Sequence, residues 1–340
     1  MAIDFDDKLK RITGATDVNH LEDIQKLWSG YGRIARYGLI GCEVKTVIVK
    51  EARQPRIEHH PRGWSSSTSS LRKLHSYQIE SNWYEKWAKL CGEKSRVAHC
   101  YGVQASANEF LMVLEDLDGS GYSGRREQAT LNEARLCLRW LAYFHAQFLT
   151  TERSTLPAGL WETGTYWHLA TRQEEFEKIG DNQPIKKWAK AIDSRLQSCR
   201  FYTIVHGDAK LANFCFDEQA EGVAAVDFQY VGGGCGIKDV ALLISSIFDS
   251  TECERYENSL LDSYFKFLSE ALVESYSSIS AAEVEAEWRP LYAYAWADFI
   301  RFLTGWCADH WKVHAYSQAL TQGVIDELSL ELPLEPKPPG

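Results

Sequence analysis

The sequence predicts an α+β protein with two lobes: a small β-rich N-terminal lobe and a larger, mainly helical C-terminal lobe. The chain has 340 residues, a length that commonly forms two domains. Short apolar runs typical of strands occur early in the chain, and longer segments with helical periodicity follow. We place the lobes at residues 1–117 and 118–332, and we expect the proline-rich tail at 333–340 to be extended and disordered.

The N-terminal lobe is expected to contain both helices and strands. Residues 1 to about 29 have the pattern of one or two amphipathic helices. Val44–Lys50 predicts a strand, the polar segment 61–70 a flexible loop, and Leu71–Leu90 a helix. Leu111–Leu117 predicts a further strand near the end of the lobe.

The C-terminal lobe is expected to consist mostly of helices. Thr130 and Glu133 form a capping-box pattern at the start of a core helix, in which His145 occupies a packed position. Asp239 precedes an apolar run and fits the N-cap of another helix. From Trp288 onward aromatic residues recur at helical spacing, which predicts further core helices.

A short strand and a β-hairpin are expected to carry polar residues at their ends. Phe201–Val205 predicts a buried strand that leads into a loop containing Asp208. The runs 214–216 and 223–226, joined by a polar segment that ends in glycine, predict the hairpin. Pairing of Phe216 with Val223 would place residue 213 beside residue 226. Asn213 and Asp227 would then emerge at the same end of the hairpin.

These polar residues have the types and the order that magnesium-dependent phosphoryl transfer requires. The reaction needs charge neutralisation and alignment of the acceptor oxygen with the leaving group. Asp208 is expected to accept a proton from a substrate hydroxyl or to orient that hydroxyl. Lys210 would bring positive charge to the transferring phosphoryl group. Asn213 and Asp227 offer the hard oxygen ligands that suit Mg²⁺ bound to a nucleotide.

The chain resembles the kinase-like small-molecule phosphotransferases, which include aminoglycoside phosphotransferases, choline kinases and the ecdysteroid-kinase-like group. The resemblance rests on the segment 206–208, on Asn213 five residues beyond Asp208, and on the segment 227–229. It extends over roughly residues 28 to 310. It implies a two-lobed protein-kinase-like fold that uses ATP and Mg²⁺ to phosphorylate a hydroxyl group of a small molecule. It also implies that Asp239 braces the catalytic loop, a role that is compatible with an N-cap.

The same resemblance implies a nucleotide site in the N-terminal lobe. Lys50 would pair with Glu80 and hold the inner phosphates of the nucleotide, and the backbone of Glu115 and Leu117 would bind adenine. Gly30 and Gly32 stand where a kinase fold places its nucleotide-covering loop, and glycine permits close approach of the backbone to phosphates. No third glycine completes the G-x-G-x-x-G pattern of protein kinases.

The C-terminal aromatic segment is where such phosphotransferases build their acceptor pocket. Asp298 and Trp306 are our candidate substrate contacts, because a carboxylate among aromatic rings suits an ammonium group or a broad apolar ring system. The net charge of −10 argues against a nucleic-acid partner and favours cationic acceptors. Nine cysteines without a C-x-x-C pair, no leader sequence and no long apolar run indicate a cytoplasmic protein that does not bind a membrane.

Other functional classes stay open at this point. A catalytically silent nucleotide-binding protein on the same fold is the main alternative. The glycine cluster Gly232–Gly236 resembles the G-x-G-x-x-G motif of an NAD-dependent oxidoreductase, but Ile237 stands where the third glycine is needed. We therefore expect a flexible segment there. A protein kinase is disfavoured because no Ala-Pro-Glu sequence follows Asp227. A metal-dependent hydrolase would use His206 and Asp208 as ligands, with no further ligands that can be placed.

Overall fold

The computed structural model describes residues 5–27, 30–54 and 67–331. The expected tail at 333–340 and most of the expected loop at 61–70 lie outside these ranges. The chain divides into two compact units. Unit 1 comprises Met1–Arg126, Pro157–Leu160 and Ala212–Val231, and unit 2 comprises Glu127–Leu156, Trp161–Leu211 and Gly232–Gly340. Unit 1 contains an antiparallel sheet and unit 2 is mainly helical, so the expected α+β fold class is confirmed.

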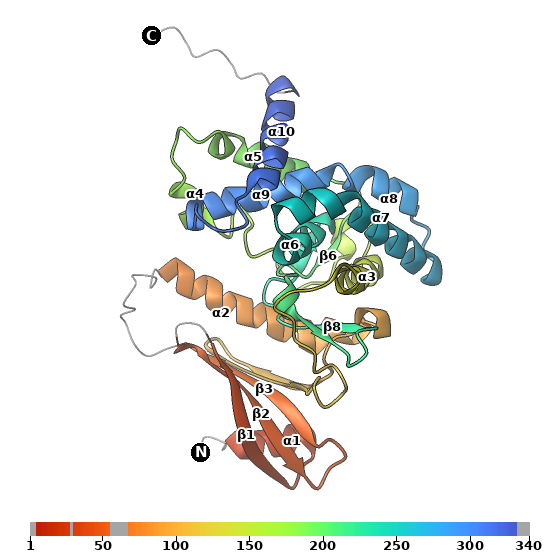
Figure 1. The fold of residues 1–340 in the computed structure, drawn as a ribbon. Helices are drawn as coiled ribbons and strands as arrows, with labels where there is room; N and C mark the ends of the chain where they lie inside the picture. Colours follow the sequence, from red (N-terminus) through yellow and green to blue (C-terminus); the bar gives the residue numbers. More distant parts are fainter. Residues whose placement is uncertain (1–4, 28–29, 55–66, 332–340) are drawn as a thin grey trace. The chain divides into compact units, whose positions relative to one another are not determined.

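The sheet of unit 1 has five antiparallel strands in the order β1-β2-β3-β5-β4 (Figure 1). The strands are β1 Asp17–Lys26, β2 Gly32–Ile40, β3 Thr46–Arg53, β4 Cys100–Ala105 and β5 Glu109–Glu115. The helices of this unit are α1 Phe5–Thr13 and α2 Ser67–Asn82, and α2 continues as a π-helical turn at Trp83–Trp87. The expectation of helices throughout residues 1–29 is therefore wrong for β1, which is an edge strand.

The two faces of the sheet pack against different helices. Val47 and Val49 point to the face covered by α1, where they share a core with Leu9. Ala52 belongs to a separate core with Tyr77 of α2. Because neighbouring residues of a strand point to opposite faces, Lys50 lies on the α2 side of β3. The position of Lys50 within the central strand β3 therefore determines the face of the sheet on which its side chain lies.

Gly32 is needed where β2 meets β3. A Cβ atom at this position would lie 2.0 Å from the carbonyl oxygen of Glu51, and the residue has a φ of +143°. We expect Gly32→Ala to lower the free energy of unfolding by at least about 2 kcal/mol, because both the contact and the backbone conformation oppose a side chain. Chemical denaturation measures this loss. Gly92→Ala is the control, since its Cβ would meet nothing within 4 Å; an equal loss in both variants would contradict the explanation.

A second, two-stranded sheet completes unit 1. It consists of β7 Phe214–Phe216 and β8 Val223–Ala225. Isolated bridges join Val97 to Ala225 and Gly124 to Phe216, and these bridges attach the hairpin to segments that follow β3 in the chain. Unit 1 therefore reaches past Leu117 to Arg126 and includes this later hairpin.

Unit 2 contains eight α-helices in its described residues and one short pair of strands, β6 Thr203–Val205 and β9 Gly232–Gly234. The capping box expected at Thr130 and Glu133 is present at the start of α3. The helices are α3 Leu131–Gln147, α4 Gln173–Glu177, α5 Pro184–Gln197, α6 Ile237–Ile247, α7 Ser250–Glu274, α8 Ala281–Trp288, α9 Leu291–Trp306 and α10 Ala315–Glu331.

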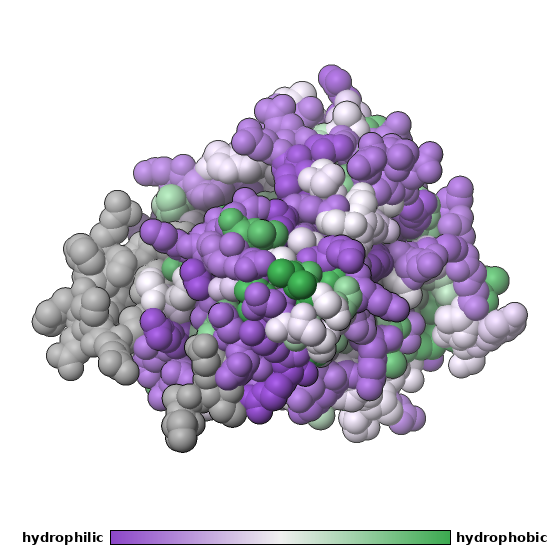
Figure 2. Space-filling model, turned by 90° about the horizontal axis from the view of Figure 1, so that it is seen from below, coloured by the Kyte–Doolittle hydropathy of each residue, from purple (hydrophilic) through white to green (hydrophobic). Residues whose placement is uncertain are grey.

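The face drawn in Figure 2 is mostly hydrophilic, and its hydrophobic residues form small separate groups. Among the described residues no helix combines the length and the apolar character that crossing a bilayer requires.

Candidate phosphotransferase site

Lys50 and Glu80 form a buried ion pair in unit 1. The Lys50 Nζ atom lies 2.8 and 2.6 Å from the two carboxylate oxygens of Glu80 on α2. An oxygen of Asp227 lies 3.7 Å from the same Nζ atom. Although burial opposes the charge of Lys50, Glu80 and Asp227 raise the pKa of its ammonium group. The lysine is therefore charged at neutral pH and fixed in direction, as a group that holds phosphates must be.

Asn213 and Asp227 leave the hairpin at the same end. Phe216 pairs with Val223, and the Val226 N–H donates to the Asn213 carbonyl oxygen at 3.0 Å, so the expected register is confirmed. Asp227 has a φ of +68°. This left-handed conformation is uncommon outside glycine, although aspartate tolerates it, and such strain is concentrated at functional sites.

The residues after Asp227 fasten this turn to α2 and its π-helical extension. Phe228 is fully buried and stacks on Trp83 at a centroid distance of 4.9 Å. The side-chain oxygen of Gln229 accepts hydrogen bonds from Lys73 at 2.7 Å and from Ser76 at 3.2 Å. Sequence reasoning missed both partners of Gln229. The amide at this position thus has a structural explanation, because a glycine would lose both hydrogen bonds to the helix.

The predicted adenine contacts lie at the end of β5. The Glu115 side chain accepts from the His99 N–H and pairs with Arg96, so it is held within unit 1. The carbonyl oxygen of Leu117 accepts from the Tyr122 N–H at 2.8 Å. Adenine binding by Glu115 and Leu117 stays a prediction.

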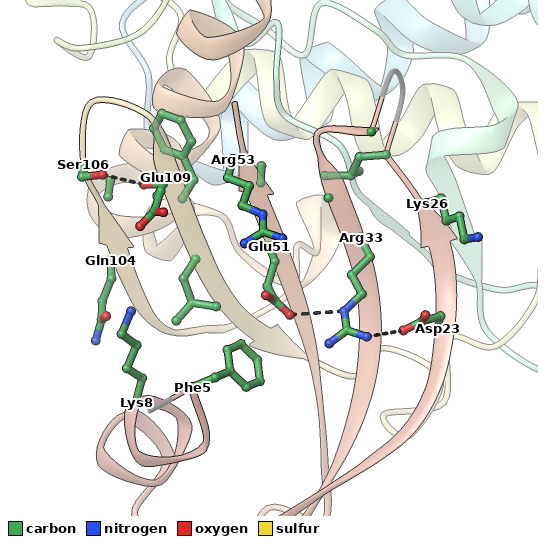
Figure 3. A pocket seen from close by; sticks show the side chains of 17 residues that line it. Phe5, Lys8, Asp23, Lys26, Arg33, Glu51, Arg53, Gln104, Ser106 and Glu109 are labelled. Carbon is green, nitrogen blue, oxygen red and sulfur yellow. Dashed lines mark hydrogen bonds and ion pairs between the residues drawn. The ribbon is translucent and has the colours of Figure 1, made fainter. Parts of the chain in front are cut away.

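Gly30 and Gly32 line a pocket together with Phe5 and Lys8 of α1. Figure 3 shows this pocket from close by, with Asp23, Arg33 and Glu51 among the labelled side chains. In that pocket Arg33 bonds to Glu51 at 3.3 Å and to Asp23 at 3.1 Å. Lys50 lies on the other face of β3. The close approach of β2 and β3 accounts for glycine at position 32, and phosphate binding by these two glycines stays a prediction.

In unit 2, Asp239 shapes the loop that carries Asp208. The Asp239 carboxylate accepts from the N–H groups of His206 at 2.6 Å and Gly207 at 3.0 Å. The Nε2 atom of His145 lies 3.1 Å from the same carboxylate, so this histidine is packed and supports Asp239. Our N-cap prediction for Asp239 is wrong: α6 begins two residues earlier, and Asp239 lies in its first turn. The Asp239 carboxylate thus caps no helix and instead accepts from the backbone N–H groups of the loop.

Asp208 is nearly buried at the end of this loop. Its N–H donates to Nδ1 of the buried His206 at 3.2 Å, so that nitrogen carries no proton. The Asp208 Oδ2 atom accepts from the Lys210 ammonium at 2.8 Å. The backbone and the ion pair together hold the carboxylate in one orientation. An ionised, oriented carboxylate suits a group that must accept a hydroxyl hydrogen.

The glycine cluster at 232–236 has a packing role. Gly232–Gly234 forms the buried strand β9, so the expected flexible segment is wrong. A Cβ atom at Gly232 would lie 2.3 Å from the Trp161 carbonyl oxygen, and one at Gly236 would lie 2.6 Å from the Trp288 ring. Close packing of backbone and rings requires these glycines, and no dinucleotide-binding turn is present here.

Asp298 and Trp306 both lie on α9 but in different environments. Asp298 is fully buried, and its Oδ1 atom bonds to Arg301 at 2.7 Å. The Lys238 Nζ atom lies 3.5 Å from its other oxygen. Asp298 therefore offers no exposed carboxylate to an acceptor, which corrects the reasoning that made it a substrate contact. Trp306 is 49% exposed and stacks on Phe302.

The matched region of the sequence decides the family. A model of the phosphotransferase enzyme family matches residues 96–276, more than half of the chain. The chain belongs to the phosphotransferase enzyme family. The residues that match the family model include Asp208, Lys210, Asn213 and Asp227, whereas Lys50 and Glu80 precede the matched region. No curated protein is significantly similar to the chain in sequence.

Several solved structures are similar to this phosphotransferase. An amicoumacin kinase in complex with AMP-PNP and Ca²⁺ is 14% identical, with 94% of this chain and 90% of that chain covered and a TM-score of 0.47. An aminoglycoside phosphotransferase from Streptomyces rimosus is 12% identical, with 84% and 96% covered and a TM-score of 0.44. A choline kinase from Cryptosporidium parvum is 8% identical, with 93% and 90% covered and a TM-score of 0.49. The sequence identities and TM-scores of these structures are low, so the family assignment rests on the family model that matches residues 96–276.

Proposed function

We propose that this phosphotransferase moves the terminal phosphoryl group of Mg²⁺-bound ATP to a hydroxyl group of a small molecule. The observation that carries the proposal is the cluster of Lys50, Glu80 and Asp227. It places one charged ammonium group beside two carboxylates and beside the hairpin end that also carries Asn213. One positive and two negative charges leave a negative balance, which favours a divalent cation.

The side chains fit a magnesium-nucleotide complex by their chemistry. Asp227 and Asn213 supply a carboxylate and a carboxamide oxygen, the hard donors that Mg²⁺ prefers. Among the described residues no group of three or more His, Cys, Asp or Glu side chains is arranged to hold a metal ion. This agrees with Mg²⁺ that takes further oxygen ligands from phosphates and water. When bound, the ion neutralises charge on the transferring phosphoryl group.

The remaining steps use residues of this chain. Lys50, directed by Glu80, would bind the inner phosphates, and Asp208 would orient the acceptor hydroxyl and take its proton. The hydroxyl oxygen forms a bond to the terminal phosphorus, and the bond from that phosphorus to the departing ADP breaks. Lys210 would place positive charge near the transferring group. Asp208 and Asn213 are only five residues apart in the chain, which supports their action in one reaction.

Thermal unfolding with and without Mg²⁺ and ATP tests the nucleotide site. ATP at about a hundred times its dissociation constant should stabilise the protein by roughly 2.7 kcal/mol. The stabilisation should require Mg²⁺ and should be lost in Lys50→Met. Folded protein that gains no stability from MgATP would contradict the proposal.

ADP release with a panel of hydroxyl compounds tests catalysis. The panel contains amino alcohols, sugars, aminoglycosides, sterols and hydroxy acids, each with MgATP in excess. Acceptor-dependent ADP release is the expected result. Stabilisation by MgATP without acceptor-dependent release from any class would favour the catalytically silent nucleotide-binding protein instead.

A further inference from the structure

Lys312 is a buried lysine that no step of the proposed mechanism uses. It lies between α9 and α10 in unit 2 and is 8% exposed. Its Nζ atom donates to Ser245 Oγ on α6 at 3.2 Å and lies 5.3 Å from the ring centroid of Phe299 and 5.5 Å from that of Trp311. An ammonium group has three N–H donors, and Ser245 is its one hydrogen-bond acceptor among the described residues. Two donors therefore stay available in a nearly enclosed, aromatic environment.

Lys312 lies next to the loop that carries Asp208. Ser245, which accepts from Lys312, is followed in α6 by Ser246, and the Oγ atom of Ser246 accepts from the Leu211 N–H at 2.9 Å, three residues after Asp208. Burial lowers the pKa of Lys312 to about 8, while Asp208 raises this pKa and Lys210 lowers it. The neighbouring His310 has a lowered pKa, first because of burial and then because of Lys312. Lys312 is thus mostly charged at pH 7, and the charged groups that act on it in unit 2 include both Asp208 and Lys210.

Two ammonium groups of unit 2, those of Lys210 and Lys312, act near the single carboxylate of Asp208. Lys210 bonds directly to Asp208, and Lys312 adds a second positive charge. The buried carboxylate of Asp298 is paired with Arg301 and is not available to balance these charges. An ammonium group on the acceptor would be repelled here, whereas an anionic oxygen could accept the open donors of Lys312. The negative net charge of the whole chain does not report this local balance.

We propose that Lys312 is a specificity-determining residue that binds an anionic oxygen group of the acceptor. This inference rests on the proposed function, and it narrows the acceptor to a hydroxyl compound that also carries a carboxylate or a phosphate. The buried aromatic surroundings make Lys312 strongly selective for an anionic group. A charge held away from water interacts strongly with a complementary charge, and burying it without one costs free energy.

Matched acceptors test the inference in steady-state assays. The six-carbon set is glucose, glucosamine, gluconate and glucose 6-phosphate, and the three-carbon set is glycerol, 3-aminopropane-1,2-diol, glycerate and glycerol 3-phosphate. We expect the wild type to have a higher kcat/KM for at least one of the two anionic members of a set than for its neutral and cationic members. Comparison of the carboxylate compound with the phosphate compound in each set identifies which anion is preferred. Preference for the amino compounds would overturn the inference.

Variants separate binding by Lys312 from a merely structural role. Lys312→Met should raise KM for the preferred anionic acceptor at least about tenfold, which corresponds to 1.4 kcal/mol, with a smaller change in kcat. Its KM for MgATP should not change. Ser245→Ala removes the hydrogen-bond partner of Lys312 with little change of volume and should raise the same KM. Lys266→Met, at a side chain that is 73% exposed, is the control and should leave every parameter unchanged.

Stability provides a second readout with a defined sign. The pKa of Lys312 lies below the ordinary value of 10.5, so the buried charge destabilises the fold at pH 7 and ceases to do so as pH rises from about 8 to 10.5. Lys312→Met should therefore have a higher Tm than the wild type at pH 7, with the gain shrinking through that pH window. A lower Tm with unchanged acceptor selectivity would show a structural lysine and overturn the inference.

Two further outcomes keep this inference distinct from the proposed function. A wild type that gains stability from MgATP but neither binds nor phosphorylates an anionic hydroxyl compound overturns the role of Lys312 alone. A folded wild type without any response to MgATP overturns the proposed function itself. If Lys312→Met does not fold, Ser245→Ala decides: an unchanged KM for the anionic acceptor contradicts the proposal.

Discussion

Asp208→Asn is expected to lower kcat by about 10² to 10⁴-fold while MgATP still stabilises the protein. The carboxamide keeps the size of the side chain but no longer accepts the proton of the acceptor hydroxyl. The substitution removes the ion pair with Lys210, but the loop backbone stays held by the Asp208 N–H bond to His206 and by the bonds of His206 and Gly207 to Asp239. Single-turnover measurements with saturating acceptor give the rate of the chemical step.

Asp217→Asn is the control for this prediction. Asp217 lies in the turn of the β7-β8 hairpin and bonds to the N–H of Glu221. Its replacement should leave kcat within about twofold, because it contributes no charge to the proposed reaction. If Asp208→Asn retains wild-type kcat with a confirmed acceptor, the assignment of the proton acceptor is wrong.

Asp298→Asn is expected to lower the free energy of unfolding by about 3–5 kcal/mol. Asp298, Arg301 and Lys238 are all almost fully excluded from solvent. Arg301 also donates to the Trp167 carbonyl oxygen at 2.6 Å, so it cannot turn toward water without breaking that bond. Removal of the one negative charge leaves two buried positive charges without compensation. Urea unfolding at pH 7 measures the effect.

An exposed ion pair provides the comparison for Asp298. Glu283 pairs with Arg200 at 2.9 Å, and both side chains are more than half exposed. Glu283→Gln should cost less than about 1 kcal/mol, because water screens such a pair. Equal losses from Asp298→Asn and Glu283→Gln would contradict the importance that we assign to the buried cluster.

The sequence predicts the site best where local patterns determine geometry. The pairing of Phe216 with Val223 follows from strand and turn signals, and it places Asn213 and Asp227 together without information from distant residues. The bonds from Lys73 and Ser76 to Gln229 cannot be derived in this way, since they join residues more than 150 positions apart. Long-range pairs of this kind depend on tertiary packing.

The incorrect predictions also have physical causes. In β1 only Val18 is buried, so this edge strand lacks the alternating apolar pattern by which strands are recognised. The N-cap prediction for Asp239 is wrong because helix boundaries are weakly marked in sequence, and α6 begins at Ile237. The ion pair of Asp298 with Arg301 could have been expected from the sequence. Arg301 follows three residues later, the spacing at which side chains on one face of a helix meet.

Lys312 shows how far function can depend on residues that no motif marks. Nothing in the residues around it distinguishes it from a surface lysine, and its burial arises from packing against α6 and α9. Its effect on Asp208 appears only when the separate segments of unit 2 are assembled. Motifs thus indicate the chemistry of this family, whereas the choice of acceptor depends on the folded surroundings.

Titration calorimetry of ATP with and without Mg²⁺ tests the central claim most directly. The account predicts that the wild type binds MgATP, that affinity falls strongly without Mg²⁺, and that Asp227→Asn weakens MgATP binding by at least about tenfold, or 1.4 kcal/mol. Glu270→Gln, at an exposed position on α7, should bind like the wild type. Equal affinity of the wild type and Asp227→Asn for MgATP, or equal binding with and without Mg²⁺, would contradict the account.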